Sequence, residues 1–333
     1  MPYEMFTDEQ TRALVNLAQS YSGWITAERA LEALPYDLKI REINGARYLY
    51  ETFDRSGNGK SLGRLDVHKQ LEFDRYRKLK FETKDRRDGS RVILEENTRL
   101  YRALRLPLLP NPAGRILREA DRRGLLGSDL LVVGTNAFPA YAVEANGFIR
   151  DAPDETQDFD LAWIREAAEE GAQTLWDTLK AADSTYTINT ERPFQARNRD
   201  AYEVEILVAP SRAAGLFRTD KPQPVPLPEQ EWLLLGRTVD HVVVCRDGSP
   251  ARLIVPDPRY FALHKLWMSE QEKRNPLKRP KDRKQGIALL DAIATAMPHY
   301  RLDSEFEMSL PVELVSHFQE WRARQQAPLK PSW

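Results

Sequence analysis

Three acidic residues in the middle of the chain have the types and spacing of a metal-binding set. Asp158 and Asp160 are separated by one residue, so on a β-strand both side chains would lie on one face, close enough to share divalent metal ions. Glu205 interrupts a second apolar segment, between Val204 and Ile206. Three convergent carboxylates beside a phosphate site are what two-metal phosphoryl transfer requires, with ions roughly 3.5–4 Å apart that activate a hydroxyl and neutralise the leaving pyrophosphate.

A candidate phosphate site precedes these acids. The apolar run Leu130–Val133 predicts a short buried strand, and it leads into Gly134, Thr135 and Asn136. The residues that follow predict a helix of small and aromatic side chains. A strand that ends in glycine and a hydroxyl residue at a helix start exposes backbone N–H groups and the positive end of the helix dipole, which suit a phosphate.

The order of these features is more informative than any one of them. With 50 acidic residues in 333, roughly seven or eight acid-x-acid pairs are expected by chance, and most such pairs are solvated strand edges or helix caps. What favours a phosphoryl-transfer site is the succession of a strand, Gly-Thr, a helix, a strand with Asp-x-Asp and a later strand with an isolated acid.

The segments that must position these residues fall into three regions. We expect a helical N-terminal region over 1–126, a catalytic core over 127–256 and a helical C-terminal lobe over 257–333. In the core, Glu203–Val208 alternates like a half-buried strand, and residues 242–255 predict a hairpin around Asp247-Gly248. The fold class is therefore α/β (α+β), with a small mixed sheet that holds the carboxylates.

The N-terminal region is dense in charge and has helical spacing. Thr7 and Gln10 have the pattern of a capping box. A long helix is predicted over 38–53, an exposed helix or helical hairpin arm over 67–81, a turn over 86–89, and a helix from Asn111 to about Gly124. The C-terminal region is expected to end in a polar tail from Gln325.

Composition and charge exclude several classes of protein. Lys and Arg number 49 against 50 Asp and Glu, so binding to nucleic acid or an anionic membrane must come from a local patch. No apolar run approaches the ~20 residues of a membrane span, and the first residues are neither basic nor apolar, unlike a secretory signal. We therefore expect a soluble, cytoplasmic protein with no membrane partner.

Other catalytic chemistries have no support in the sequence. Cys245 is the single cysteine, and the five histidines are scattered, which excludes an internal disulfide and a Cys or His zinc cluster. The segment 54–61 lacks the first glycine of a phosphate-binding P-loop and the terminal acid of a calcium loop, so it is predicted to be a turn.

Taken in order, Gly134-Thr135-Asn136-Ala137, Asp158-Phe159-Asp160 and Val204-Glu205-Ile206 resemble the polymerase-beta-like nucleotidyltransferase superfamily. The stretch from Val255 to Gln285 is similar to the helical C-terminal part of a bacterial branch of nucleotidyltransferase-fold proteins and of the abortive-infection toxin nucleotidyltransferases. The resemblance covers residues 130–285. It implies a Mg²⁺- or Mn²⁺-dependent enzyme that moves a nucleoside monophosphate from an NTP to a hydroxyl acceptor.

The resemblance also implies roles for particular residues. Gly134 and Thr135, with Asn136 beside them, would hold the nucleotide's phosphates. The metal ligands and catalytic residues would be Asp158, Asp160 and Glu205, with Glu205 helping to deprotonate the acceptor. In the cleft between sheet and C-terminal lobe, Lys265 would neutralise the triphosphate, with Arg274 and Lys281 nearby and Asp282 orienting Lys265 or touching the base.

The sequence departs from the superfamily in three places. The distance from Gly134 to Asp158 is 24 residues, longer than usual, Thr135 stands where Ser is commoner, and Glu205 stands where Asp is commoner. These departures keep an alternative open, in which a catalytically retired protein binds nucleotide, nucleic acid or a protein partner through its N-terminal helical region. A third alternative is a structural helical protein in which the three carboxylates lie far apart.

The acceptor is left open as RNA (such as a tRNA end), a protein or a small molecule. The segment from Lys273 to Lys284 holds seven Lys and Arg residues in a near-neutral chain. Phosphate contacts need Lys and Arg, so this segment suits an RNA acceptor, although a solvated surface would have the same composition.

Overall fold

A computed structural model describes residues 3–152, 158–166, 175–216 and 221–326 of the chain. The chain divides into two compact units, of which unit 1 joins Met1–Val15 to Tyr101–Trp333 and unit 2 is Asn16–Leu100. The polar tail predicted from Gln325 lies, from residue 327 on, outside the described residues.

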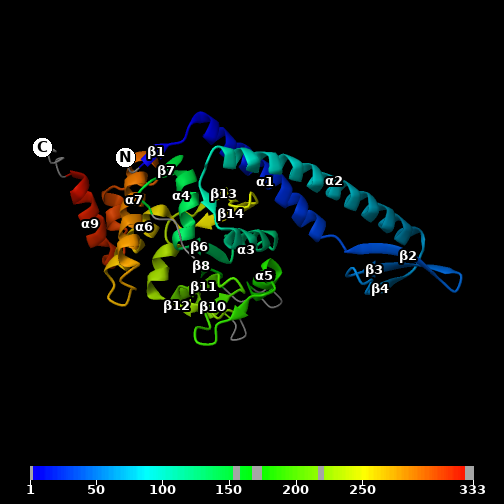
Figure 1. The fold of residues 1–333 in the computed structure, drawn as a ribbon. Coiled ribbons are helices and arrows are strands. Elements are labelled where there is room, and N and C mark those ends of the chain that lie inside the picture. Colours follow the sequence, from blue (N-terminus) through cyan, green and yellow to red (C-terminus); the bar gives the residue numbers. More distant parts are fainter. Residues whose placement is uncertain (1–2, 153–157, 167–174, 217–220, 327–333) are drawn as a thin grey trace. The chain divides into compact units, whose positions relative to one another are not determined.

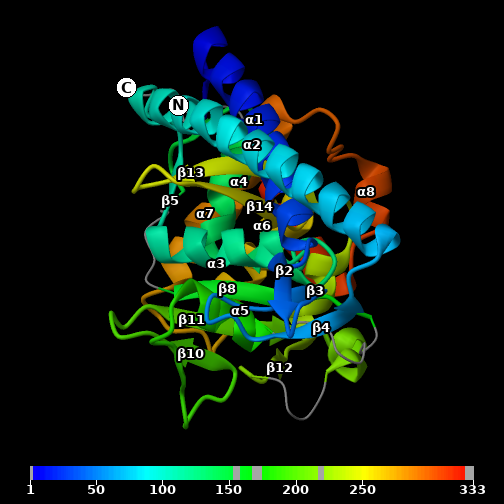
Figure 2. The ribbon, with the colours of Figure 1, turned by 90° about the vertical axis from the view of Figure 1, so that its right-hand side faces the viewer.

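The central sheet of unit 1 contains the strands that carry the acids. Its order is β6-β8-β11-β10-β9, with β12 paired to β11. Figure 2 shows β8, β11 and β10 in this order. Its strands are β6 (Leu130–Val133), β8 (Asp158–Trp163), β9 (Thr187–Ile188), β10 (Gln195–Arg197), β11 (Glu203–Val208) and β12 (Val225–Pro226). Because β8 is parallel to β11 and antiparallel to β6, the sheet is mixed, and the predicted α+β fold class is confirmed.

A second sheet and a set of helices complete unit 1. The second sheet has the order β14-β13-β5, and its predicted hairpin is confirmed, while β1 pairs with β7. These strands are β1 (Tyr3–Met5), β5 (Leu108–Leu109), β7 (Gly147–Ile149), β13 (Val239–Cys245) and β14 (Pro250–Val255). The helices are α3 (Asn111–Arg122), α4 (Phe138–Glu144), α5 (Leu175–Ala182), α6 (Pro258–Glu270), α7 (Arg279–Ala296), α8 (Ser304–Met308) and α9 (Val312–Gln326), with 3-10 turns η1 (Thr135–Ala137), η2 (Pro210–Gly215) and η3 (Pro228–Leu234).

One hydrophobic core joins the sheets of unit 1 to its C-terminal helices. Val132 and Ile206 of the central sheet are fully buried, as are Phe261 of α6 and Leu289 of α7. Helices α6 and α7 pack against each other (Figure 1). The α6–α7 pair is therefore fixed to the sheet by side chains with no solvent exposure, and the loop between the two helices starts and ends at rigid positions.

Two long helices form most of unit 2. Helix α1 (Asp8–Glu32) starts at the predicted capping box, in which Gln10 N donates to Thr7 Oγ1 at 3.2 Å and Thr7 N donates to Gln10 Oε1 at 2.9 Å. Within unit 2 it runs antiparallel to α2 (Val67–Ala103), because Asn97 Nδ2 donates to Ser20 Oγ at 3.0 Å near one end and Arg87 contacts Glu28 near the other. The exposed helix predicted over 67–81 is confirmed as the start of α2.

The helix predicted over 38–53 is wrong. This segment forms β2 (Asp37–Ile43) and β3 (Ala46–Thr52), and β4 (Gly59–Arg64) completes a sheet of order β2-β3-β4 at the N-terminal end of α2 (Figure 1). Asn44 and Gly45 between β2 and β3 have φ of 50° and 74°. Positive φ at both residues is the geometry of the tight hairpin turn that Asn-Gly favours, so this dipeptide was the signal that decided the structure.

The turn predicted over 86–89 is also wrong, because α2 continues through it to Ala103. Glycine in a helix costs about 1 kcal/mol relative to alanine. Here packing on α1 offsets that cost, since Arg87 contacts Glu28 and the backbone of Gly23 lies close to Ser90. Among the described residues no helix has both the length and the apolar character needed to cross a membrane.

Candidate active site

The acidic residues lie side by side on two neighbouring strands of the central sheet. Asp160 of β8 is directly opposite Glu205 of β11, and Asp158 is opposite Glu203. Paired strands are about 4.8 Å apart, and residues two apart share a face, so four carboxylates occupy one face of the sheet. The alternative in which Asp158, Asp160 and Glu205 lie far apart is therefore wrong.

The predicted glycine turn lies directly against these acids. Val133 of β6 pairs with Asp160, and Gly134 follows with φ 74° and ψ −161°, a conformation that is essentially restricted to glycine. A Cβ atom at this position would lie 2.1 Å from Oδ2 of Asp160. Asn136 Nδ2 donates to the backbone oxygen of Asp158 at 3.0 Å. Only glycine at residue 134 lets the turn approach the carboxylate so closely.

Crowding of the acids changes their pKa values. Burial, followed by the charges of Asp158 and Glu205, raises the pKa of Asp160 to about 7. Burial and then the charge of Asp158 raise the pKa of Glu205. Burial alone would also raise the pKa of Asp158, but a hydrogen bond from Lys278 Nζ at 2.6 Å and the lysine's charge lower it overall. The site therefore disfavours further negative charge and attracts cations.

Gln195 holds two of the carboxylates in place. It lies opposite Glu205 on the antiparallel strand β10, and its Nε2 donates to Glu205 Oε1 at 3.1 Å and to Glu203 Oε2 at 2.8 Å. Its side chain is buried. Sequence reasoning missed Gln195 and Glu203 as site residues. Glu203 forms an acid-x-acid pair with Glu205 that was visible in the sequence. Nothing in the local pattern pointed to Gln195.

Three predicted nucleotide-binding residues form one ionic cluster around the buried Asp282. Lys265 Nζ of α6 donates to Asp282 Oδ1 at 3.0 Å, and Arg274 Nε donates to Asp282 Oδ2 at 2.7 Å. Burial alone would raise the pKa of Asp282, but the charge of Lys265 and then Arg274 lower it. Asp282 thus remains ionised and holds two cations, leaving a net positive charge in the cluster.

The loop and first turns of α7 bring this cluster to the sheet. Lys278, which the sequence analysis placed in the basic segment without a partner, is bound to Asp158, and Gln285 Nε2 donates to Thr135 Oγ1 at 3.3 Å. Burial and then the charge of Lys265 lower the pKa of Lys281, which also senses the charge of Asp158. Lys278 and Asp158, which are 120 residues apart in the sequence, therefore meet at the start of β8.

The carboxylates of the site are the right type of ligand for a hard cation such as Mg²⁺, but in the structure they are not arranged around a common point. Carboxylate oxygens are the ligands that Mg²⁺ prefers, and the charge of Lys278 offsets the raised pKa values of Asp160 and Glu205 only in part. Within the described residues, however, no three Asp, Glu, His or Cys side chains surround a common point as metal ligands. The contact of Asp158 with Lys278 turns one of the acids toward a cation of the protein itself.

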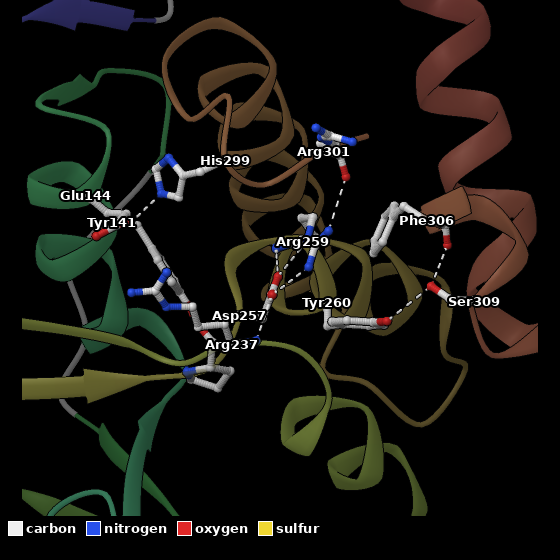
Figure 3. Close-up of polar contacts among 11 residues, drawn as sticks. Tyr141, Glu144, Arg237, Asp257, Arg259, Tyr260, His299, Arg301, Phe306 and Ser309 are labelled. Carbon is white, nitrogen blue, oxygen red and sulfur yellow. Dashed lines mark hydrogen bonds and ion pairs between the residues drawn. The ribbon is translucent and has the colours of Figure 1, made fainter. Parts of the chain in front are cut away.

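Two polar networks fix the helices that flank the site (Figure 3). Asp257 caps α6, and its carboxylate accepts hydrogen bonds from the N–H of Arg237 and from the backbone and guanidinium of Arg259. Arg259 also donates to the backbone oxygen of Arg301 at 3.2 Å and lies over the ring of Phe306. This network fixes the start of the helix that presents Lys265.

The second network fixes the end of α4. Glu144 accepts hydrogen bonds from Nε2 of His241 at 2.5 Å and Nε2 of His299 at 2.7 Å, the latter drawn in Figure 3. The bond from His241, and then that from His299, lower the pKa of Glu144 to about 2, against the effect of burial. Helix α4 follows the glycine turn, so this anchor holds the turn from its far side.

Replacing Glu144 with Gln is expected to destabilise the protein in a pH-dependent way. A pKa depressed in the folded state contributes stability above the unfolded value of 4.5 that is lost as the pH falls toward 2. The expected loss in unfolding free energy is on the order of 3 kcal/mol at pH 6 and about half of that at pH 3. Urea unfolding at the two pH values measures it, with Glu313→Gln on the exposed start of α9 as a control. An equal loss of unfolding free energy at both pH values would contradict the lowered pKa of Glu144 as its cause.

The mixed sheet places the glycine turn and the paired acids beside the cations of α6, α7 and the loop between these helices. The sequence model of a nucleotidyltransferase family matches residues 111–309, more than half of the chain and all of the site described above. The chain therefore belongs to this nucleotidyltransferase family, and its function class is nucleotidyl transfer. No curated protein and no solved structure matches it.

Proposed function

We propose that the protein is a metal-dependent nucleotidyltransferase of the bacterial polymerase-beta-like branch, which moves a nucleoside monophosphate from an NTP to a hydroxyl acceptor. The observation that carries this proposal is the register of the sheet, which pairs Asp160 with Glu205 directly beside Gly134. Asp158, Asp160 and Glu205 would hold Mg²⁺ or Mn²⁺ in the core expected over residues 127–256. The bound ions would supply charge neutralisation for the pyrophosphate and lower the pKa of the acceptor hydroxyl.

Other residues of the site would bind the phosphates, accept the proton of the acceptor and neutralise the triphosphate. Backbone N–H groups of Gly134 and Thr135 would bind phosphate oxygens, and Gln285 would orient the Thr135 hydroxyl. Glu205, whose pKa is raised, would accept the acceptor's proton while Gln195 keeps its carboxylate in position. The buried Lys265 and the partly exposed Arg274, with Lys281, would neutralise the triphosphate.

The contact between Lys278 and Asp158 suggests what changes when the ligand binds. At 2.6 Å the ammonium occupies the position beside Asp158 that a metal ion would need. Arrival of an NTP with its metal would free the lysine to contact the triphosphate, since Lys278 lies on the loop that meets the sheet. The ion pair therefore acts as a substitute for the cation in the free protein.

Replacing Lys278 with Ala is expected to tighten binding of Mn²⁺ in the absence of nucleotide about fivefold. Removing the competing ammonium takes one positive charge away from Asp158, and a partly exposed ion pair is worth about 1 kcal/mol. Titration of Mn²⁺ followed by electron paramagnetic resonance measures the change. The matched control is Lys273→Ala, an exposed lysine of the same loop. Unchanged or weaker Mn²⁺ binding in Lys278→Ala would contradict the account of the ion pair.

Transfer of label from α-phosphate-labelled NTPs tests the proposed function. The wild type is incubated with Mg²⁺ and three acceptor classes, namely a tRNA mixture, the protein itself or a lysate, and small hydroxyl compounds such as aminoglycosides. Covalent label on one class, with release of pyrophosphate, supports the proposal and names the acceptor. Binding of NTP without release of pyrophosphate under any of these conditions would instead support the catalytically retired alternative.

A further inference from the structure

The basic segment from Lys273 to Lys284 is largely engaged within the protein. Arg274 and Lys278 bind Asp282 and Asp158, while Arg279 donates to the backbone oxygens of Glu272 and Arg274. Arg283 contacts Glu270 at 3.4 Å. Cations that hold the loop in the free protein, and would contact the triphosphate once an NTP binds, leave few contacts for a polymeric phosphate as well. An extended anionic ligand would need another surface.

Unit 2 contains a groove with the properties of such a surface. The groove has a volume of about 690 Å³ and runs between the edge strand β2 and helix α2. Five cations line it against one acid, and three aromatic rings accompany them. The lining cations are Lys39, Arg41, Arg77, Lys80 and Lys84, the acid is Asp37, and the rings are Phe73, Tyr76 and Phe81.

The charge of the groove is local and mostly exposed. Unit 2 has 17 Lys and Arg residues against 14 Asp and Glu, so the excess is small over the unit and concentrated here. Asp37 is already compensated by Lys39 at 3.5 Å and Lys80 at 3.6 Å. Arg41, Arg77 and Lys84 are exposed, and Arg41 and Arg77 lie over the rings of Tyr50 and Phe73. The groove therefore presents net positive charge to solvent.

The aromatic side chains distinguish between possible anionic ligands. Phe81 is 73% exposed although it lies between the cations of α2. A base of a single strand can stack on such a ring because every base has a π-face, whereas the carboxylate side chains of an acidic peptide have none. Arg77 and Lys84 are separated by about 10 Å along the helix, a span of about three stacked nucleotides. Cations that bind phosphates, alternating with rings that stack bases, are the pattern of proteins that bind single strands without strong sequence preference.

We infer that the groove between β2 and α2 is a docking surface for single-stranded nucleic acid. Phosphates contact Arg77, Lys84 and Arg41, and a base stacks on Phe81. Binding by itself does not depend on the transfer reaction. The further role of the groove, holding a nucleic-acid acceptor whose terminal hydroxyl receives the nucleotide, rests on the proposed function.

Fluorescence anisotropy with a labelled 12-nucleotide uridine RNA and the full chain, without NTP, tests the inference at several salt concentrations. For single strands, each phosphate contact contributes about 0.7 to the slope of log K against log salt. The double variant Arg77→Gln/Lys84→Gln is therefore expected to reduce the slope by about 1.4 and to weaken binding about 25-fold at 0.1 M salt. Phe81→Ala is expected to weaken binding about fivefold or more with the slope unchanged.

The matched control is Arg75→Gln/Arg86→Gln. These two arginines are exposed on the same helix, outside the lining of the groove, and the control removes the same charge. Equal weakening by both double variants, or no binding of the RNA at low salt, would overturn the inference. So would a poly-glutamate peptide that displaces the RNA as effectively as unlabelled RNA does, because the groove would then be a site for acidic protein segments.

The same measurement separates this inference from the proposed function. Asp158→Asn/Asp160→Asn is expected to bind the RNA as tightly as the wild type, because neither residue contributes to the groove. Wild-type binding that fails in the groove variant therefore supports the docking surface whether or not the chain transfers nucleotides. Loss of RNA binding in the carboxylate variant would overturn the assignment of binding to unit 2.

Discussion

Replacing Asp158 and Asp160 together by Asn is expected to lower nucleotidyl transfer at least ~1,000-fold. The two carboxylates share a face of β8 and border Glu205, so their loss removes most of the negative charge that would hold the metal ions. Charge neutralisation in the transition state is worth several kcal/mol, and about 4 kcal/mol corresponds to this factor. Release of pyrophosphate at saturating NTP and Mg²⁺ measures the change.

The structure predicts that the same variant folds normally. Burial and repulsion raise the pKa of Asp160 to about 7, so neutral side chains relieve repulsion among the acids. The unfolding temperature is therefore expected to be equal to or above that of the wild type. Asp200→Asn, an exposed change in the loop before β11, serves as the control for activity. Activity within tenfold of the wild type in the double variant would contradict the proposed metal site.

The second large effect is expected from Gly134→Ala, with a loss of activity of at least ~100-fold. The added Cβ would lie 2.1 Å from Oδ2 of Asp160, and the backbone conformation is one that alanine rarely adopts. Either the turn or the carboxylate must move, and both belong to the proposed site. Steady-state kinetics are expected to show a lower kcat and a higher KM for the NTP, because the phosphate-binding turn and the metal ligand move together.

Gly124→Ala is the matched control for this change. Gly124 also has a φ of 74°, but a Cβ there would have no atom within 4 Å. The cost of positive φ alone is roughly 1–2 kcal/mol, and it is expected to lower stability slightly without changing activity. Wild-type kinetics in Gly134→Ala would show that the close approach of turn and carboxylate has no catalytic importance.

Local sequence patterns were sufficient for β6, which leads into the glycine turn, and for β11, which carries Glu205. The apolar run Leu130–Val133 predicted β6, because a strand buried on both faces is apolar throughout. The alternation over Glu203–Val208 predicted β11, because a strand buried on one face alternates between apolar and polar residues. The spacing of Asp158 and Asp160 predicted that both lie on one face if the segment is a strand, and the segment forms β8. The roles assigned to these residues remain predictions.

Contacts between distant segments could not be predicted in this way. The register that places Glu205 opposite Asp160 depends on packing of the whole core, and no local pattern encodes the pairing of Gln195 with Glu205 or of Lys278 with Asp158. The error over 38–53 has a different cause. Asn44-Gly45 is a strong hairpin signal, and it outweighs the helical spacing of the flanking apolar residues.

The placement of charge in the two units has a consequence for how an acceptor would be handled. In unit 1 the cations of the loop and of α7 are paired with Asp158, Asp282 and Glu270, which suits a compact triphosphate. In unit 2 Arg77 and Lys84 flank the exposed ring of Phe81, which suits an extended strand. Chemistry and docking would then be located in different units of one chain.

Isothermal titration of ATP, CTP, GTP and UTP in the presence of Mg²⁺ is the most direct test of the central claim, that the paired acids and the glycine turn form a metal-dependent nucleotide site. It compares the wild type with Asp158→Asn/Asp160→Asn, and each titration is repeated with EDTA in place of Mg²⁺. We expect the wild type to bind at least one NTP, and this binding to be lost both with EDTA and in the double variant. Binding that is equally tight without Mg²⁺, or retained in the double variant, would contradict the central claim.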